Sequence, residues 1–144
     1  MMRPLRMMFI AATLVMSSCK RDLPTETTSA VVLAAERAAY AAGDTAVFTM
    51  SNATATPLYL PSCCSQAIVI LQVNKAGTWI DTLAVGEPCL MMCPSALLKV
   101  NTKQVYADRM PLKWIGTFRL KMYYGWSQES FRTDSVLSRE ISVQ

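Results

Sequence analysis

The fold class is decided by the stretch GTFRLKMYY, residues 116–124, in which apolar and polar side chains alternate. Phe118, Leu120 and Met122 fall on one face of an extended chain, and Arg119 and Lys121 fall on the other. This period of two is typical of a β-strand that packs one face on a core. No segment of the chain shows a long apolar stripe with the period of a helix. The sequence therefore predicts an all-β protein.

Other short runs of the same kind recur along the chain with turn residues between them. Residues 67–73 are rich in β-branched residues and apolar on both faces, which predicts an internal strand. The turn residues 74–77 lead into residues 78–83, which predicts a hairpin. Further strands are predicted at 31–33, 46–52, 58–60, 97–100, 104–107 and 135–143, while residues 34–39 also fit a helical turn. About seven short strands at this spacing predict a single antiparallel β-sandwich.

Composition and charge exclude several classes of function. The 144 residues are 52% hydrophobic and 17% charged, which suits one globular domain. The net charge of +4 is too small to predict nucleic-acid binding. The chain has no His, which excludes His-dependent catalysis, and it has no P-loop. Asp108 and Arg109 are interpreted as a solvated turn rather than a catalytic pair. We therefore expect a non-enzymatic binding or structural module without a cofactor.

The N-terminus has the pattern of a secretory signal. Arg3 and Arg6 precede the apolar run 7–16, which at ten residues is too short to span a bilayer. Small residues and a cysteine follow, as the sequence VMSSC at residues 15–19. Cleavage before Cys19 removes both arginines, leaves 126 of the 144 residues and lowers the net charge from +4 to +2.

The sequence VMSSC resembles the lipobox of bacterial lipoproteins, with Met16 where Leu is usual. The resemblance implies acylation of Cys19, by chains such as palmitate, and anchoring to a membrane through that lipid. By resemblance to enterobacterial sorting, Lys20 after the cysteine favours the outer membrane. The expected organisation is a signal peptide at 1–18, the lipidated cysteine with a polar tether at 19–29, and a β-sandwich at 30–144.

The rest of the chain resembles the Ig-like domains of small bacterial lipoproteins. It also resembles, in its general sequence pattern, the bacterial intracellular proteinase inhibitor domain. Three motifs carry this resemblance: the spacing YxxGDxxxFxxxN at 40–52, the GTW at 77–79 and the GTFRL at 116–120. The usual Pro-Gly turn is missing, and Asn-Thr-Lys stands at 101–103 instead. The motifs imply a fold and say little about function.

Four cysteines follow Cys19, and in an exported domain they predict two disulfides. A bond between the adjacent Cys63 and Cys64 would be strained, so each is expected to pair with Cys89 or Cys93, in either arrangement. The alternative is a copper site, because thiolates and thioethers suit Cu(I). Its ligands would come from Cys63, Cys64, Cys89, Met91, Met92 and Cys93.

Binding is the function class that the remaining residues favour. Trp79 and Trp114 are expected to pack mostly inside, as are Tyr123, Tyr124 and Trp126, but Tyr123 and Tyr124 alternate and Trp126 enters a polar loop. These last three are therefore the candidate contact residues for an envelope protein or glycan. A second hypothesis is peptidase inhibition through the loop 88–94, which is flanked by prolines and held by cysteines.

Overall fold

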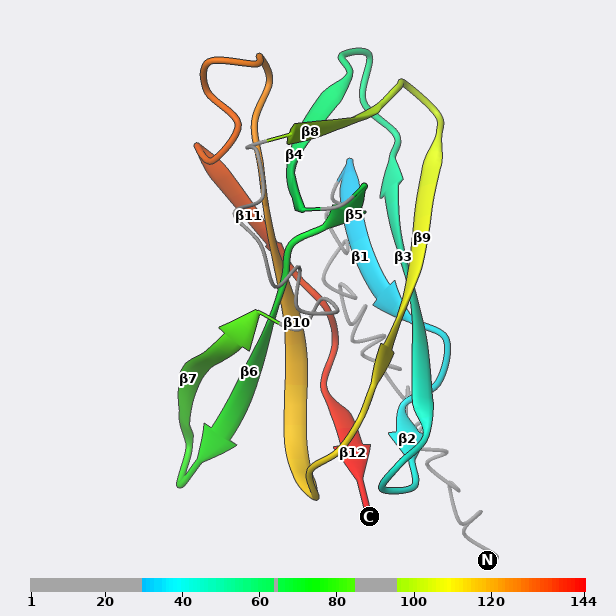
Figure 1. The fold of residues 1–144 in the computed structure, drawn as a ribbon, viewed down its shortest axis with the longest axis vertical. Helices are drawn as coiled ribbons and strands as arrows, with labels where there is room; N and C mark the ends of the chain where they lie inside the picture. Colours follow the sequence, from blue (N-terminus) through cyan, green and yellow to red (C-terminus); the bar gives the residue numbers. More distant parts are fainter. Residues whose placement is uncertain (1–29, 64, 85–95) are drawn as a thin grey trace, which may run out of the picture.

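The computed structural model describes residues 30–63, 65–84 and 96–144, and in these ranges every regular element is a β-strand (Figure 1). In the same ranges no helix is long and apolar enough to cross a membrane. The signal peptide, Cys19, the tether, Cys64 and the segment containing Cys89, Met91, Met92 and Cys93 lie outside the described residues. The predictions made for them stay predictions.

The larger layer is a six-stranded sheet that contains the alternating stretch of the sequence. Its strands follow the order β2 (Ala39–Tyr40), β12 (Ile141–Val143), β10 (Gly116–Tyr124), β6 (Val69–Lys75) and β7 (Thr78–Ala84), and β11 (Asp134–Leu137) also pairs with β10. All its pairings are antiparallel except that of β2 with β12. The predicted hairpin is confirmed as β6 and β7, with β6 internal to the sheet (Figure 1).

Two three-stranded sheets complete the fold. One has the order β1 (Val31–Ala35), β3 (Thr45–Asn52) and β9 (Val105–Pro111). The other has the order β5 (Gln66–Ala67), β4 (Leu58–Cys63) and β8 (Ala96–Val100). A two-bond bridge between Tyr59 and Gly125 joins β4 to the chain just after β10, at 2.9 and 3.0 Å.

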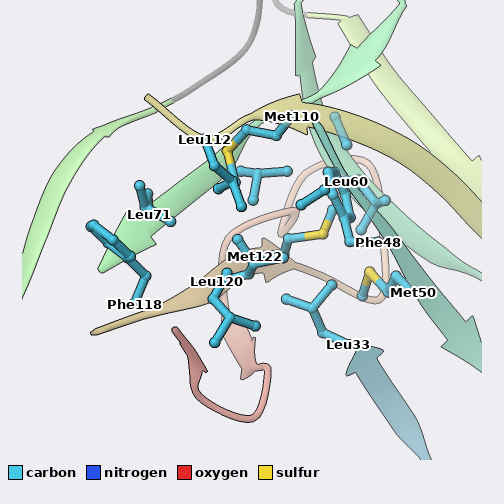
Figure 2. Close-up of a cluster of buried hydrophobic side chains, with 14 of the residues drawn as sticks. Leu33, Phe48, Met50, Leu60, Leu71, Met110, Leu112, Phe118, Leu120 and Met122 are labelled. Atoms are coloured by element: carbon cyan, nitrogen blue, oxygen red, sulfur yellow. The ribbon is translucent and has the colours of Figure 1, made fainter. Parts of the chain in front are cut away.

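The core lies between these sheets and contains the apolar face that the sequence predicted (Figure 2). Phe118, Leu120 and Met122 are at most 3% exposed, and they face buried side chains from the other sheets. Figure 2 shows those partners, which include Leu33, Phe48, Met50, Leu60 and Met110. Burial of each such side chain contributes about 1.5–3 kcal/mol. The all-β, Ig-like sandwich is thus confirmed.

Three local predictions were wrong. Residues 34–39 form no helical turn, because β1 runs to Ala35 and a bend follows. The strand predicted at 104–107 extends to Pro111, so Asp108 and Arg109 lie in β9 and not in a turn. The last strand is divided into β11 and β12 at Ser138.

The division at Ser138 has a clear cause in its hydrogen bonds. Its side-chain hydroxyl accepts the N–H of Leu120 at 2.8 Å, and its own N–H donates to the carbonyl of Leu120 at 2.9 Å. The hydroxyl therefore takes the place of a backbone carbonyl in the ladder. The described residues form twelve strands against nine predicted runs, because the runs 67–73 and 135–143 are each divided in two and the short β2 is additional.

Candidate binding surface

The outer face of the six-stranded sheet carries an ordered group of polar and aromatic side chains. We name it the outer-face cluster, and its members are Gln72, Trp79, Asp81, Arg119, Lys121 and Tyr123. Strand register brings them together, because Arg119 of β10 lies opposite Gln72 of β6, which lies opposite Asp81 of β7. Alternation turns these side chains away from the core that their neighbours fill.

Arg119 is held by two different partners. Its guanidinium carbon lies 4.3 Å from the centre of the Trp79 ring, within the range of a cation–π contact. Its Nε–H donates to Oε1 of Gln72 at 2.6 Å. Among the described residues, no acceptor takes a hydrogen bond from its Nη1 or Nη2 groups. The guanidinium is therefore fixed in place, while no described residue uses the hydrogen-bond donors of its Nη1 and Nη2 groups.

Gln72 is the polar centre of the cluster. It is only 6% exposed although it lies on the outer face of the sheet, because the cluster covers it. Its side-chain carbonyl accepts from Arg119 and its amide nitrogen donates to a carboxylate oxygen of Asp81. A buried amide that is satisfied on both sides fixes the positions of both charged partners.

Lys121 and Asp81 complete the cluster as an ion pair. The Lys121 Nζ lies 3.1 Å from Oδ2 of Asp81 and 4.8 Å from the centre of the Tyr123 ring. The Gln72 amide, and then Lys121, lower the pKa of the Asp81 carboxyl. The polar contact with Tyr123, and then Asp81, raise the pKa of the Lys121 ammonium. Both groups are thus held in their charged forms.

The charges of the cluster do not cancel. Arg119 and Lys121 contribute two positive charges and Asp81 contributes one negative charge, so the cluster carries a net charge of +1. The Lys121 ammonium has three hydrogens and donates one of them to Asp81. This arrangement suits a ligand that brings one anionic group together with neutral polar groups.

The second aromatic region lies at the end of β10. Tyr124 is half-buried and packs against the core, and Trp126 meets it edge-on with ring centres 5.6 Å apart. The indole N–H of Trp126 donates to Oδ2 of Asp134 at 2.7 Å, and 40% of the residue is exposed. Burial, and then Asp134, raise the pKa of the Tyr124 hydroxyl.

Gly125 lies between Tyr124 and Trp126, where the following loop approaches the backbone closely. A Cβ atom at this position would lie 1.5 Å from the carbonyl oxygen of Ser130, so only glycine fits. The close approach folds the loop after β10 against the strand end. Alternation along β10 divides the three residues predicted as contact residues, with Tyr123 in the outer-face cluster and Tyr124 with Trp126 at the sandwich end.

The prediction that most aromatic residues pack inside was wrong for the three tryptophans, none of which belongs to the core cluster. Trp114 is 54% exposed in the turn between β9 and β10, and Trp126 is exposed as described above. Trp79 is half-buried, but its ring lies under Arg119 on the outer face rather than in the core. In each case the polar partner or the turn position, and not hydrophobicity, determines where the ring lies.

Asp108, which was predicted to lie in a turn, is hydrogen-bonded to Tyr106 of the same strand. It accepts a hydrogen bond of 2.6 Å from the Tyr106 hydroxyl, which itself accepts the N–H of Ala67 at 2.9 Å. Burial, and then the bond to Asp108, raise the pKa of Tyr106. This chain of bonds ties β9 to β5 and has a structural role.

Cys63 is the one cysteine among the described residues, half-buried at the end of β4. Its predicted partners, and the methionines of the alternative copper site, lie outside the described residues. Within the described ranges, no three His, Cys, Asp or Glu side chains gather where they could hold a metal ion. The disulfide and copper hypotheses therefore stay predictions from the sequence.

Gln72, Asp81 and the role of Arg119 were not predicted from the sequence. The signal for one pairing was present, because a hairpin turning at 74–77 places Gln72 opposite Asp81. The pairing of β6 with β10 joins residues 47 positions apart, and no local pattern marks it.

Comparison with known proteins gives fold-level likenesses alone. No family model matches the chain, and no curated protein matches it. Among solved structures, the alkylpurine DNA glycosylase AlkC of Pseudomonas fluorescens, bound to DNA with an abasic site analog, is 10% identical, with a TM-score of 0.40. That match covers 80% of this chain but only 30% of the glycosylase.

A second solved structure is the CARDB domain of PF1109 from Pyrococcus furiosus. It is 10% identical, with a TM-score of 0.35, and the match covers 79% of this chain and 94% of that domain. At such low scores neither likeness supports a conclusion about the function or the site of this protein.

Proposed function

We propose that this protein is a lipid-anchored lipoprotein of the bacterial envelope that acts as a non-enzymatic binding module. The observation that carries the binding role is the outer-face cluster. Its Arg119 is fixed by Trp79 and Gln72 while its outer N–H groups remain unbonded among the described residues. A side chain that is already ordered loses little entropy when it binds a ligand.

The anchor in this proposal is Cys19, supported by the lipobox-like sequence at residues 15–19. Residues 19–29 would span at most roughly 40 Å when fully extended, at about 3.6 Å per residue. A tether of that reach lets the sandwich lie close to the outer membrane and still turn its sheet toward a ligand. Several acyl chains on one cysteine make such an anchor stable.

The cysteines after Cys19 are proposed to form two disulfides. In support of this, the chain carries four cysteines after a sequence that resembles an export signal. Each bridge would close a loop of roughly 25–30 residues, and the loss of unfolded-state entropy would stabilise the domain by about 3–4 kcal/mol. Intact-mass analysis after alkylation without reduction tests this, because added label would contradict it.

The binding role is tested by saturable binding of the purified full chain to isolated bacterial envelopes. The double substitution Trp79→Ala and Arg119→Ala removes the fixed guanidinium and should lower the apparent affinity at least tenfold. The matched control is Val105→Ala with Arg109→Ala, which changes two exposed residues on β9 in the other layer. Equal loss in both variants, or no loss in either, contradicts the proposal.

The anchor is tested separately by metabolic labelling with a palmitate analogue in a bacterial host. Label should enter the wild-type chain and be absent from Cys19→Ser, which should also leave the membrane fraction. Label that persists in Cys19→Ser, or a wild-type chain free of label, contradicts the lipoprotein assignment.

A further inference from the structure

We propose that the outer-face cluster binds an acidic carbohydrate, with Arg119 and Lys121 holding the anionic group of a sugar whose hydroxyls reach Asp81. This inference rests on the proposed binding function and names the chemistry of its ligand. It follows from the donors that no described residue uses, from the sign of the charge and from the carboxylate that Asp81 provides on β7, the edge strand of the sheet.

The anionic group is indicated by the state of Arg119. Its Nε–H donates to Gln72 and one face is stacked on Trp79, and no residue within 30–63, 65–84 and 96–144 accepts a hydrogen bond from its Nη groups, which can meet an external acceptor. A planar guanidinium matches the two oxygens of a carboxylate, or of a phosphate, in a bidentate geometry. Lys121, two positions along the same strand, offers ammonium hydrogens that Asp81 does not use.

The spacing of charge argues against a dense polyanion. A nucleic acid or a polyacidic peptide needs a row of uncompensated cations, but the negative Asp81 lies within hydrogen-bond distance of Lys121. A second carboxylate placed there would be repelled, whereas a hydroxyl would donate to it. The side chain of Asp81 is 44% exposed, so its oxygens are accessible to such a donor.

The aromatic residues favour a sugar ring over a small free anion. Trp79 and Tyr123 flank the charged groups on the same face of the sheet, each with a cation 4.3 or 4.8 Å from its ring centre. Aromatic rings pack against the C–H groups of a sugar through their faces, while the cations beside them would meet its acidic substituent. The ligand that meets these requirements is a glycan carrying one acidic group per few hydroxyls.

The test is calorimetric titration of the purified full chain with tetragalacturonate and with its methyl ester. The ester has the same sugar rings without the charges. We expect binding of the acid to be at least tenfold tighter than binding of the ester, and to weaken as the salt concentration rises. Ester and acid binding equally well would overturn the anionic part of the proposal.

Variants locate the site. Arg119→Ala should lower the affinity for tetragalacturonate at least tenfold, and Arg119→Lys, which keeps the charge but loses the fork, should recover only part of it. Arg109→Ala on β9 should bind as the wild type does. Each variant is first shown to unfold cooperatively near the wild-type midpoint. Unchanged binding by Arg119→Ala would overturn the assignment of this face.

Further probes separate the ligand sources. Galacturonate and galactose 1-phosphate, compared as monosaccharides, show whether a carboxylate or a phosphate is preferred, and tighter binding of either than of galactose supports the anionic sugar. Polyglutamate binding more tightly than tetragalacturonate would overturn the carbohydrate assignment. Failure of every acidic sugar would overturn this inference, while the envelope-binding experiment decides the proposed function independently.

Discussion

The two faces of the six-stranded sheet are built from alternate residues of the same strands and are ordered by different forces. On the inner face, Leu120 and Met122 are fully buried and pack against apolar side chains (Figure 2). On the outer face, Arg119 and Lys121 are ordered by an amide, a carboxylate and two aromatic rings. The inner face is held by loss of apolar surface to water, and the outer face by directional contacts.

The difference shows how one strand separates stability from recognition. Loss of an inner side chain leaves a cavity and destabilises the whole domain. Loss of an outer side chain removes partly exposed contacts whose net stabilisation is small. Substitutions on the outer face should therefore alter binding without unfolding the protein.

The largest expected difference is between neighbours on β10. Leu120→Ala should lower the free energy of unfolding by about 2–5 kcal/mol, because a fully buried leucine is replaced by a cavity. Arg119→Ala should lower it by about 1 kcal/mol or less. Urea unfolding of both variants measures the difference, and equal destabilisation would contradict the division of roles.

The next largest effect is expected at Gly125, directly after the end of β10. Gly125→Ala should destabilise by about 3 kcal/mol, since its Cβ would collide with the Ser130 backbone. The matched control is Gly77→Ala, which has open space around it and only the strain of a φ of +85°. That control should cost about 1 kcal/mol. A control that costs more than Gly125→Ala would show that the close approach is not limiting.

A smaller effect is expected from the polar centre of the outer face. Gln72→Leu keeps the buried volume but leaves Arg119 and Asp81 without their shared partner, and should cost about 1 kcal/mol. The exposed Gln66 of β5 is the control, and Gln66→Leu should be neutral. Equal thermal midpoints for the wild type and Gln72→Leu would mean that the cluster contributes no stability.

The smallest effect concerns pH and has a defined sign. The folded-state pKa of Asp81 lies below its ordinary value of 3.8, so its stabilisation is present above that pH and is lost as the pH falls further. The folded-state pKa of Lys121 is raised, so its stabilisation is lost as the pH rises above its ordinary value of 10.5. Comparison with Asp81→Asn should show a difference of a few tenths of a kcal/mol at neutral pH that vanishes in acid.

Much of the inner face was readable from the sequence, and much of the outer face was not. Alternation in residues 116–124 placed Phe118, Leu120 and Met122 in the core because burial follows hydrophobicity. The same alternation placed Arg119 and Lys121 outside, but it carried no information on which strand would lie beside them. Their partners depend on a pairing between distant segments, which local pattern does not encode.

Prediction of strand ends and burial from the sequence also failed where tertiary contacts decide them. Ser138 ends a strand because its hydroxyl accepts the backbone N–H of Leu120. Nothing in the neighbouring sequence distinguishes it from an ordinary strand serine. Trp114 was expected inside and is exposed because it lies in the short connection between β9 and β10. Such contacts depend on tertiary geometry.

The central claim is that the outer face is ordered before any ligand binds, and nuclear magnetic resonance of the Arg119 side chain tests it most directly. In the free protein we predict a slowly exchanging Nε–H and side-chain protons shifted upfield by the Trp79 ring, with both features lost in Gln72→Leu. A rapidly exchanging Nε–H with the shifts of a free arginine would contradict the claim.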